Sequence, residues 1–260
     1  MKEFQILLDV WEGSLDIDED VLLAEGVAGV IPRLNDINGG HHMDTNFTAQ
    51  YQQAKPFPVH GVIYFVYNPW VSGRANFEWL AKHAPADVRS VMPDIEVTYP
   101  GYEIPSGVYS NEVQIFFDLC KQNWTSFIYT GGWFYNRLKY WPDADYCIAR
   151  YPYSLYPSTK ERWTWDQLRG ALLSMKYYPG LPPNMKTGVL SADRLKLWQC
   201  SGDRLILPGT KDRPVDVIVY PGSLESLVSW LGGTVPEPKP VELTLEEKVN
   251  LLWEGHPTLH

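Results

Sequence analysis

Four acidic side chains stand in or directly after short apolar runs, where they could do chemistry together. The run from Val88 to Pro93 leads into Asp94 and, two residues further, Glu96. Side chains two residues apart on a strand point to the same face, so both carboxylates should leave the strand end side by side. Like charges that close do not ionise independently, and one group can stay protonated beside an anion. That combination is the chemistry of glycosidic bond cleavage.

A D-x-E triplet by itself is more often a solvated strand end, so the other two acids decide the interpretation. Asp9 ends the first apolar run, Ile6–Leu8, and Asp216 lies inside the β-branched run Val215–Tyr220. An unpaired carboxylate in a buried strand is costly, which indicates a functional or ion-paired role. The pattern predicts one site that contains all four acids.

Length and composition limit the class of protein. The 260 residues, 45% hydrophobic and 20% charged, suit one main globular domain, and a single α/β barrel of about 250 residues would use nearly all of them. No apolar run reaches the roughly 20 residues of a membrane span, so we expect no membrane insertion. The net charge of −9 and the absence of a Lys/Arg cluster argue against nucleic acid as a partner. The first residues lead directly into the first predicted strand, so we expect no signal peptide.

Neither the cysteines nor the histidines indicate a metal. Cys120, Cys147 and Cys200 have no metal-like spacing and no even number for a disulfide framework, so we expect buried free thiols. Adjacent His41 and His42 stand in a loop beside glycines, which is typical of a solvated turn. We predict no metal and no cofactor.

Aromatic content is the one unusual feature of the composition, with 11 Trp and 16 Tyr. Many of these residues adjoin Pro, Gly or polar residues rather than lying deep in apolar runs. Flat rings with a polar edge suit the apolar faces of sugars, although half or more of them could serve only in packing.

Strand-like runs alternate with helix-like segments, which is the signal for parallel β/α units. Strands are expected at residues 5–9, 29–33, 59–67, 90–95, 126–129, 145–150, 195–199 and 215–220. Helices are expected at residues 18–25, 44–55, 75–83, 110–123, 133–141, 163–176 and 224–231. The predicted fold is a TIM-like β/α barrel of eight strands with an incomplete set of outer helices. Active sites of such barrels lie at the C-terminal strand ends, where Asp9, Asp94, Glu96 and, less closely, Asp216 fall.

The chain divides into three parts by composition. The predicted barrel covers residues 1–232 and is followed by a Pro-rich linker at residues 233–242. Residues 243–260 form a short tail in which Thr244 and Glu247 fit a helix capping box. Residues 160–188, between the sixth and seventh strands, look like an insertion that reshapes one wall of the site.

Six short segments, in order along residues 5–232, resemble motifs of the family 25 glycoside hydrolases, the lysozymes of phage endolysins and of some bacterial and fungal secretions. The segments are Leu8–Gly13, Asp94–Glu96, Ile128–Gly131, Tyr146–Tyr151, Leu197–Ser201 and Val215–Tyr220. Six ordered partial matches are far more specific than any one of them. One departure is Tyr64, which stands where the family has a substrate-facing His, and this change could shift specificity or pH optimum.

The resemblance implies an activity and a role for each acid. The reaction is hydrolysis of the β-1,4 bond between N-acetylmuramic acid and N-acetylglucosamine in peptidoglycan. Glu96 would be the general acid, Asp94 would orient or stabilise the partner species, and Asp9 and Asp216 would line the cleft and raise the pKa of Glu96. The expected substrate-binding residues are Trp11, Arg33, Tyr64, Tyr67, Tyr129, Tyr151 and Trp198. The course of the reaction, with or without an intermediate, stays open.

The leading interpretation is a muramidase of the endolysin type. Its partner would be the peptidoglycan glycan strand, and it would stay in the host cytoplasm until a holin-type pore releases it to the wall. Two alternatives remain: a non-catalytic lysozyme-like module for glycan binding or virion structure, and a glycosidase acting on a chitin-like polymer. All four acids are present, which favours an enzyme. The oligomeric state is open, a monomer included, as is the role of the tail, which could dock on the barrel or a neighbouring subunit or target the wall.

Overall fold

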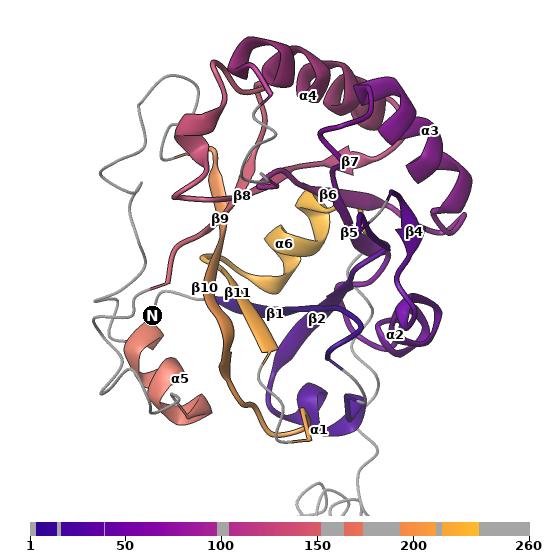
Figure 1. Cartoon of the computed structure of the whole chain (residues 1–260). Helices are drawn as coiled ribbons and strands as arrows, with labels where there is room; N and C mark the ends of the chain where they lie inside the picture. The colour runs from indigo at the N-terminus through magenta and orange to yellow at the C-terminus, as the bar shows by residue number, and fades with distance from the viewer. Residues whose placement is uncertain are drawn as a thin grey trace, which may run out of the picture.

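A computed structural model describes residues 4–14, 17–38, 40–97, 104–151, 164–173, 193–211 and 215–233. Within them, nine strands form one sheet in the order β2-β1-β11-β10-β9-β8-β6-β5, with β7 paired to β6. The sheet curls around a central axis (Figure 1). Its strands are β1 Gln5–Val10, β2 Val27–Pro32, β5 Val62–Val66, β6 Ser90–Asp94, β7 Thr125–Ser126, β8 Ile128–Gly131, β9 Tyr146–Ala149, β10 Leu195–Leu205 and β11 Val215–Tyr220; β3 Asn35–Asp36 and β4 His42–Met43 pair separately.

The two ends of this sheet meet and close a barrel. Parallel bridges join Gly29 to Val59 and Arg33 to Tyr64, and the Val59 amide donates to the Ala28 carbonyl over 2.8 Å. A Cβ atom on Gly29 would lie 2.6 Å from the Val59 carbonyl oxygen, so glycine allows the close approach of β2 to the segment before β5. The predicted eight-stranded, TIM-like barrel is confirmed.

One strand runs against the predicted parallel arrangement. β11 is antiparallel to both neighbours, β1 and β10. The connection from β10 to β11 is too short for a crossover helix, and a short connection can only join antiparallel strands. Asp216, the second residue of β11, therefore lies at the barrel end where β1 finishes, paired in register with Asp9.

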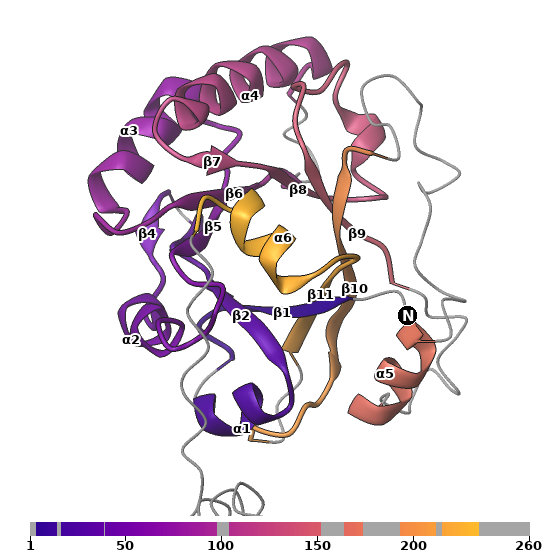
Figure 2. The same cartoon turned by 180° about the vertical axis from the view of Figure 1, so that it is seen from behind.

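Six helices within the described residues lie where the sequence predicts them, and they form an incomplete layer outside the barrel. Their bounds are α1 Glu19–Ala24, α2 Phe47–Gln53, α3 Gly73–His83, α4 Ser106–Lys121, α5 Trp165–Leu173 and α6 Leu224–Trp230. α3 and α4 lie side by side outside β6 (Figures 1 and 2). α6 lies across the barrel in both views, and its end contacts the start of β6, where Ser90 donates to the Leu231 carbonyl over 2.7 Å. α6 thus covers the barrel end away from the acids.

The helix predicted at residues 133–141 is wrong, because only a 3-10 turn forms, at Tyr135–Arg137. The Tyr135 carbonyl, which a helix would offer to the Lys139 amide, accepts instead from the Trp141 indole over 2.7 Å. The Lys139 amide donates to Ser110 of α4 over 3.0 Å. Side-chain partners therefore satisfy the groups that an α-helix would have joined.

Alternate residues of the barrel strands face two different cores. Leu7 and Leu197 belong to the cluster inside the barrel, whereas Leu8 and Trp198 pack outside it. The period of two places the next inward positions, Asp9 and Gln199 among them, at the open end of the barrel.

Several predictions concern residues outside the described ones. They include most of the insertion at residues 160–188, apart from α5, nearly all of the linker at residues 233–242, and the tail at residues 243–260. Among the described helices, none has the length and apolar character that crossing a membrane requires.

Candidate active site

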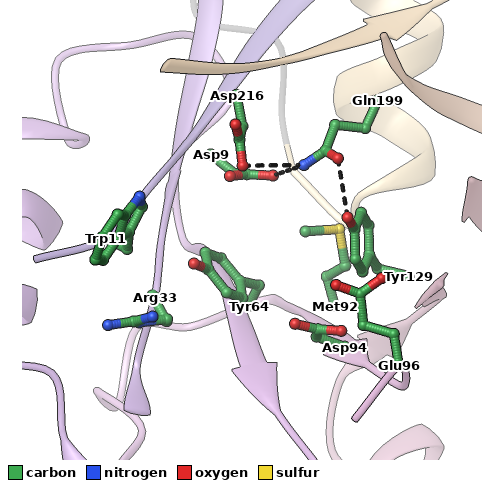
Figure 3. A pocket seen from close by; sticks show the side chains of 10 residues that line it. All are labelled: Asp9, Trp11, Arg33, Tyr64, Met92, Asp94, Glu96, Tyr129, Gln199 and Asp216. Atoms are coloured by element: carbon green, nitrogen blue, oxygen red, sulfur yellow. Dashed lines mark hydrogen bonds between the residues drawn. The ribbon is translucent and has the colours of Figure 1, made fainter. Parts of the chain in front are cut away.

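A pocket opens at the barrel end where β1 and β6 finish. It has a volume of about 220 Å³, and its lining consists of Asp9, Trp11, Arg33, Tyr64, Met92, Asp94, Glu96, Tyr129, Gln199 and Asp216 (Figure 3). Pockets for whole drug-sized ligands measure roughly 300–1,000 Å³. This one is suited to a single ring of a larger substrate.

The pocket brings all four predicted acids together. Asp9 is on β1, Asp94 is the last residue of β6, and Glu96 follows two residues later on the same face. Asp216 reaches the pocket from the start of β11. Figure 3 shows two pairs on opposite sides of the space, Asp9 with Asp216 and Asp94 with Glu96. Glycoside cleavage uses two carboxyl groups that flank the scissile bond, and this pocket offers carboxyl groups on both sides of its space.

The carboxyl groups of Asp94 and Glu96 form a pair, and the pKa of each is raised above its usual value. Burial, followed by the negative charge of Asp9, raises the pKa of Glu96 to about 7, against a smaller lowering by a hydrogen bond from the Gly131 amide. Burial, Glu96 and Asp9 raise the pKa of Asp94 well above its usual value, with Arg33 opposing. One buried oxygen of each, Asp94 Oδ1 and Glu96 Oε2, has no hydrogen-bond partner within the described structure. Because the two carboxyl groups interact, their apparent pKa values describe the pair as a whole.

Gln199 organises the opposite side of the pocket and was missed in the sequence. Its Nε2 donates to Asp9 Oδ2 over 2.7 Å and to Asp216 Oδ2 over 3.4 Å. Its Oε1 accepts from the hydroxyls of Tyr129 and Tyr151 over 2.9 and 2.8 Å. Two acceptors on the nitrogen and two donors on the oxygen use the whole capacity of the amide and fix its orientation. The Gln199 amide therefore holds Asp9 and Asp216 as hydrogen-bond acceptors.

Arg33 and Tyr64 supply fixed polar groups to the lining of the pocket. Arg33 Nε donates to the buried Asp44 over 2.7 Å, and the guanidinium lies over the Trp11 ring at 5.1 Å. Burial and the charge of Asp9 raise the pKa of the Tyr64 hydroxyl well above its usual value, partly opposed by Arg33. The hydroxyl stays protonated at physiological pH and can donate to a bound substrate.

Not every expected substrate-binding residue reaches the pocket. Tyr67 is fully buried in the outer core, where its ring packs against Tyr109 at 5.9 Å. Trp198 also faces outward, and its indole donates to the Arg150 carbonyl over 2.7 Å. Tyr151 lies beside the pocket through its bond to Gln199. Trp11, Arg33, Tyr64 and Tyr129 do line it.

The residues missed, Gln199 and Met92, carry a signal in the alternation of their strands. Gln199 stands two residues after the apolar Leu197 and so shares its inward face, as Met92 does two residues before Asp94. Trp198, between the two inward positions Leu197 and Gln199, faces the outer core.

The histidines and Asp44 belong to separate networks. The His41 ring stacks on Trp79 at 5.1 Å and hydrogen-bonds Asn76 through Nε2 over 3.0 Å, whereas Asp44 is bound to Arg33. Among the described residues, no three or more His, Cys, Asp and Glu side chains form a group that could hold a metal ion.

We expect Asp9→Asn to move the alkaline limb of activity to lower pH. The Asp9 carboxylate raises the pKa of Glu96, so a neutral amide there would lower that pKa, and Glu96 would lose its proton earlier as pH rises. A shift of about one unit is the size expected for one nearby charge. The kcat/KM profile from pH 4 to 9 measures it, and an unmoved alkaline limb would contradict the role of Asp9.

The fold and the acids define a class of protein, a β/α barrel with paired carboxylates at its open end, which is typical of glycoside hydrolases. Within this class, the chain has the fold of the family 25 lysozymes. A family 25 glycosyl hydrolase from Bacillus anthracis is 14% identical, with a TM-score of 0.62 over 87% of this chain and 92% of the other. A bacterial lysozyme from Streptomyces coelicolor is 17% identical, with a TM-score of 0.64 over 87% of this chain and 96% of the other.

The modular Cpl-1 endolysin, solved in complex with a peptidoglycan analogue, shares the same fold. It is 15% identical, with a TM-score of 0.55 over 86% of this chain and 56% of the endolysin. No protein-family model matches the sequence, and no curated protein matches it either. The resemblance predicted from short motifs is thus confirmed at the level of the fold.

Proposed function

We propose that the chain is a lysozyme that hydrolyses the β-1,4 bond between N-acetylmuramic acid and N-acetylglucosamine in peptidoglycan. The observation that carries the proposal is the pocket itself, in which Asp94 and Glu96 face Asp9 and Asp216 across the space for one ring. The fold supports it, because structures with this fold include lysozymes and an endolysin bound to a peptidoglycan analogue.

In the proposed mechanism, Glu96 gives its proton to the leaving glycosidic oxygen. A pKa of about 7 leaves Glu96 largely protonated in mildly acidic solution, as a general acid must be. Asp94 orients the species that attacks the sugar, and water supplies the hydroxyl group of the new reducing end, directly or after an intermediate. Asp9 and Asp216, held by Gln199, line the cleft and add negative potential that favours such a charge.

We expect the native chain to release new reducing ends from purified peptidoglycan, and those ends to be muramic acid. Borohydride reduction followed by sugar analysis identifies which sugar carries the new end, with chitin oligomers as the parallel substrate. Ends on N-acetylglucosamine, or equal turnover of chitin, would favour the chitin-type alternative, which the presence of Tyr64 keeps open. Binding without any released ends from pH 4 to 8 would favour the non-catalytic module. The phage-type origin and the release by a holin-type pore stay predictions.

A further inference from the structure

One large aromatic side chain near the pocket has no part in the proposed mechanism. Trp133 is 55% exposed, although Phe134 and Tyr135 directly after it are 2% and 4% exposed. A single exposed aromatic side chain is ordinary on a protein surface, so the position of Trp133 beside the pocket, and not its exposure alone, makes it a candidate ligand surface.

The backbone around Trp133 holds this ring in place. A Cβ atom on Gly131 would lie 2.2 Å from Trp133 Cε2, so glycine at that position leaves room for the indole. The Gly132 amide donates to the Ala149 carbonyl over 3.0 Å and ties the turn to the end of β9. The Tyr151 ring lies beside the indole, with centroids 5.7 Å apart. We call these two rings the Trp133–Tyr151 platform.

The platform is continuous with the pocket on two sides. The Tyr151 hydroxyl donates to Gln199, which lines the pocket and binds Asp9. The Gly131 amide, two residues before Trp133, is hydrogen-bonded to Glu96. A polymer with its reacting bond at Glu96 therefore passes close to the platform.

The size of the pocket decides what the platform holds. At about 220 Å³ the pocket suits one ring, so neighbouring sugars of a glycan must lie outside it. Pyranose rings present an apolar face of C–H groups, and an aromatic surface binds such a face without needing charge. We propose that the Trp133–Tyr151 platform is a subsite for a pyranose ring of the glycan next to the ring in the pocket. The inference rests on the proposed glycan substrate and adds the place of a second sugar.

Binding of a peptidoglycan tetrasaccharide tests the subsite. Titration calorimetry is run in a Glu96→Gln background, so that the ligand stays intact. Adding Trp133→Ala is expected to raise the Kd roughly three- to tenfold, the range for loss of one aromatic contact, and Trp133→Phe should restore most of the affinity. Tyr140→Ala is the matched control, because Tyr140 is 40% exposed and its amide is bonded to Ser110 of α4.

The outcomes separate the subsite from the proposed reaction. Unchanged affinity in Trp133→Ala, an equal loss in Tyr140→Ala, or no binding of the tetrasaccharide by the Glu96→Gln chain would each overturn the subsite. Turnover of peptidoglycan by the native chain is measured separately. If the native chain releases no reducing ends while Trp133→Ala still weakens binding, the proposed reaction fails and the subsite stands.

Discussion

Glu96→Gln is expected to lower kcat on peptidoglycan by about 10³-fold while leaving glycan binding within about twofold, because general acid catalysis contributes roughly 10²–10⁴-fold. The amide keeps the size and shape of the acid and removes only the proton that the leaving oxygen needs. Reducing-end release at pH 5 to 6 measures kcat, and calorimetry with the tetrasaccharide measures binding. A variant that keeps more than a tenth of the native rate would rule out Glu96 as the general acid.

Thermal unfolding supplies a control that does not depend on substrate. The pKa of Glu96 is raised in the folded protein from its usual value of 4.5 to about 7. The folded state therefore holds this proton more tightly than the unfolded state, and stability is lost as pH rises from about 4.5 through 7. Glu96→Gln should unfold at a higher temperature than the native chain at pH 8, and the difference should disappear near pH 4. If the variant and the native chain had the same Tm at pH 8 as well as near pH 4, the raised pKa of Glu96 would be contradicted.

Gln199→Leu is expected to be the most destabilising single change in the pocket. Leucine fills a similar volume but makes none of the hydrogen bonds of the amide to Asp9, Tyr129 and Tyr151. Loss of a buried partner costs about 1–3 kcal/mol for each group, so the free energy of unfolding should fall by about 3 kcal/mol or more. For a domain of this size that lowers Tm by roughly 6–12 °C. Scanning calorimetry measures the shift.

A second buried glutamine gives a matched control for this change. Gln50 is 3% exposed, and its Nε2 donates only to backbone carbonyls, those of Trp11 and Ser14. Gln50→Leu removes the same kind of side chain but no bond to a carboxylate. It should destabilise less than Gln199→Leu and leave the alkaline limb of activity in place. Equal losses of stability would show that Gln199 acts as an ordinary buried amide.

The sequence predicts the barrel because the strand signal is local. Apolar β-branched runs that end in Asp9 or Asp94 identify both the strands and the end where they finish. The direction of a strand relative to its neighbours is not encoded locally in this way. The prediction of parallel strands throughout failed at β11, because nothing within Val215–Tyr220 says which way the strand runs; the short connection before it does.

The site was predictable where chemistry and strand position agree. Each acid carries a chemical signal and faces inward, so all four were found. Gln199 carries no charge, and its importance comes from partners on other strands, β1 and β8 among them. Trp133 lies in a segment predicted as a helix, whereas a hydrogen bond to Ser110 of α4 and a local one to the Tyr135 carbonyl form a turn instead.

The position of β11 between β1 and β10 also determines when the molecule can become complete during synthesis. β1 is the first strand made, yet one of its two neighbours is the last, and the bond from Gln199 to Asp9 joins residues 190 positions apart. Contacts this distant in sequence form late, because a long loop must close before they are gained. The ribosome must therefore release nearly the whole barrel before Asp9 meets Asp216. No shorter nascent chain can hold a finished pocket, so activity should appear only once translation has passed β11.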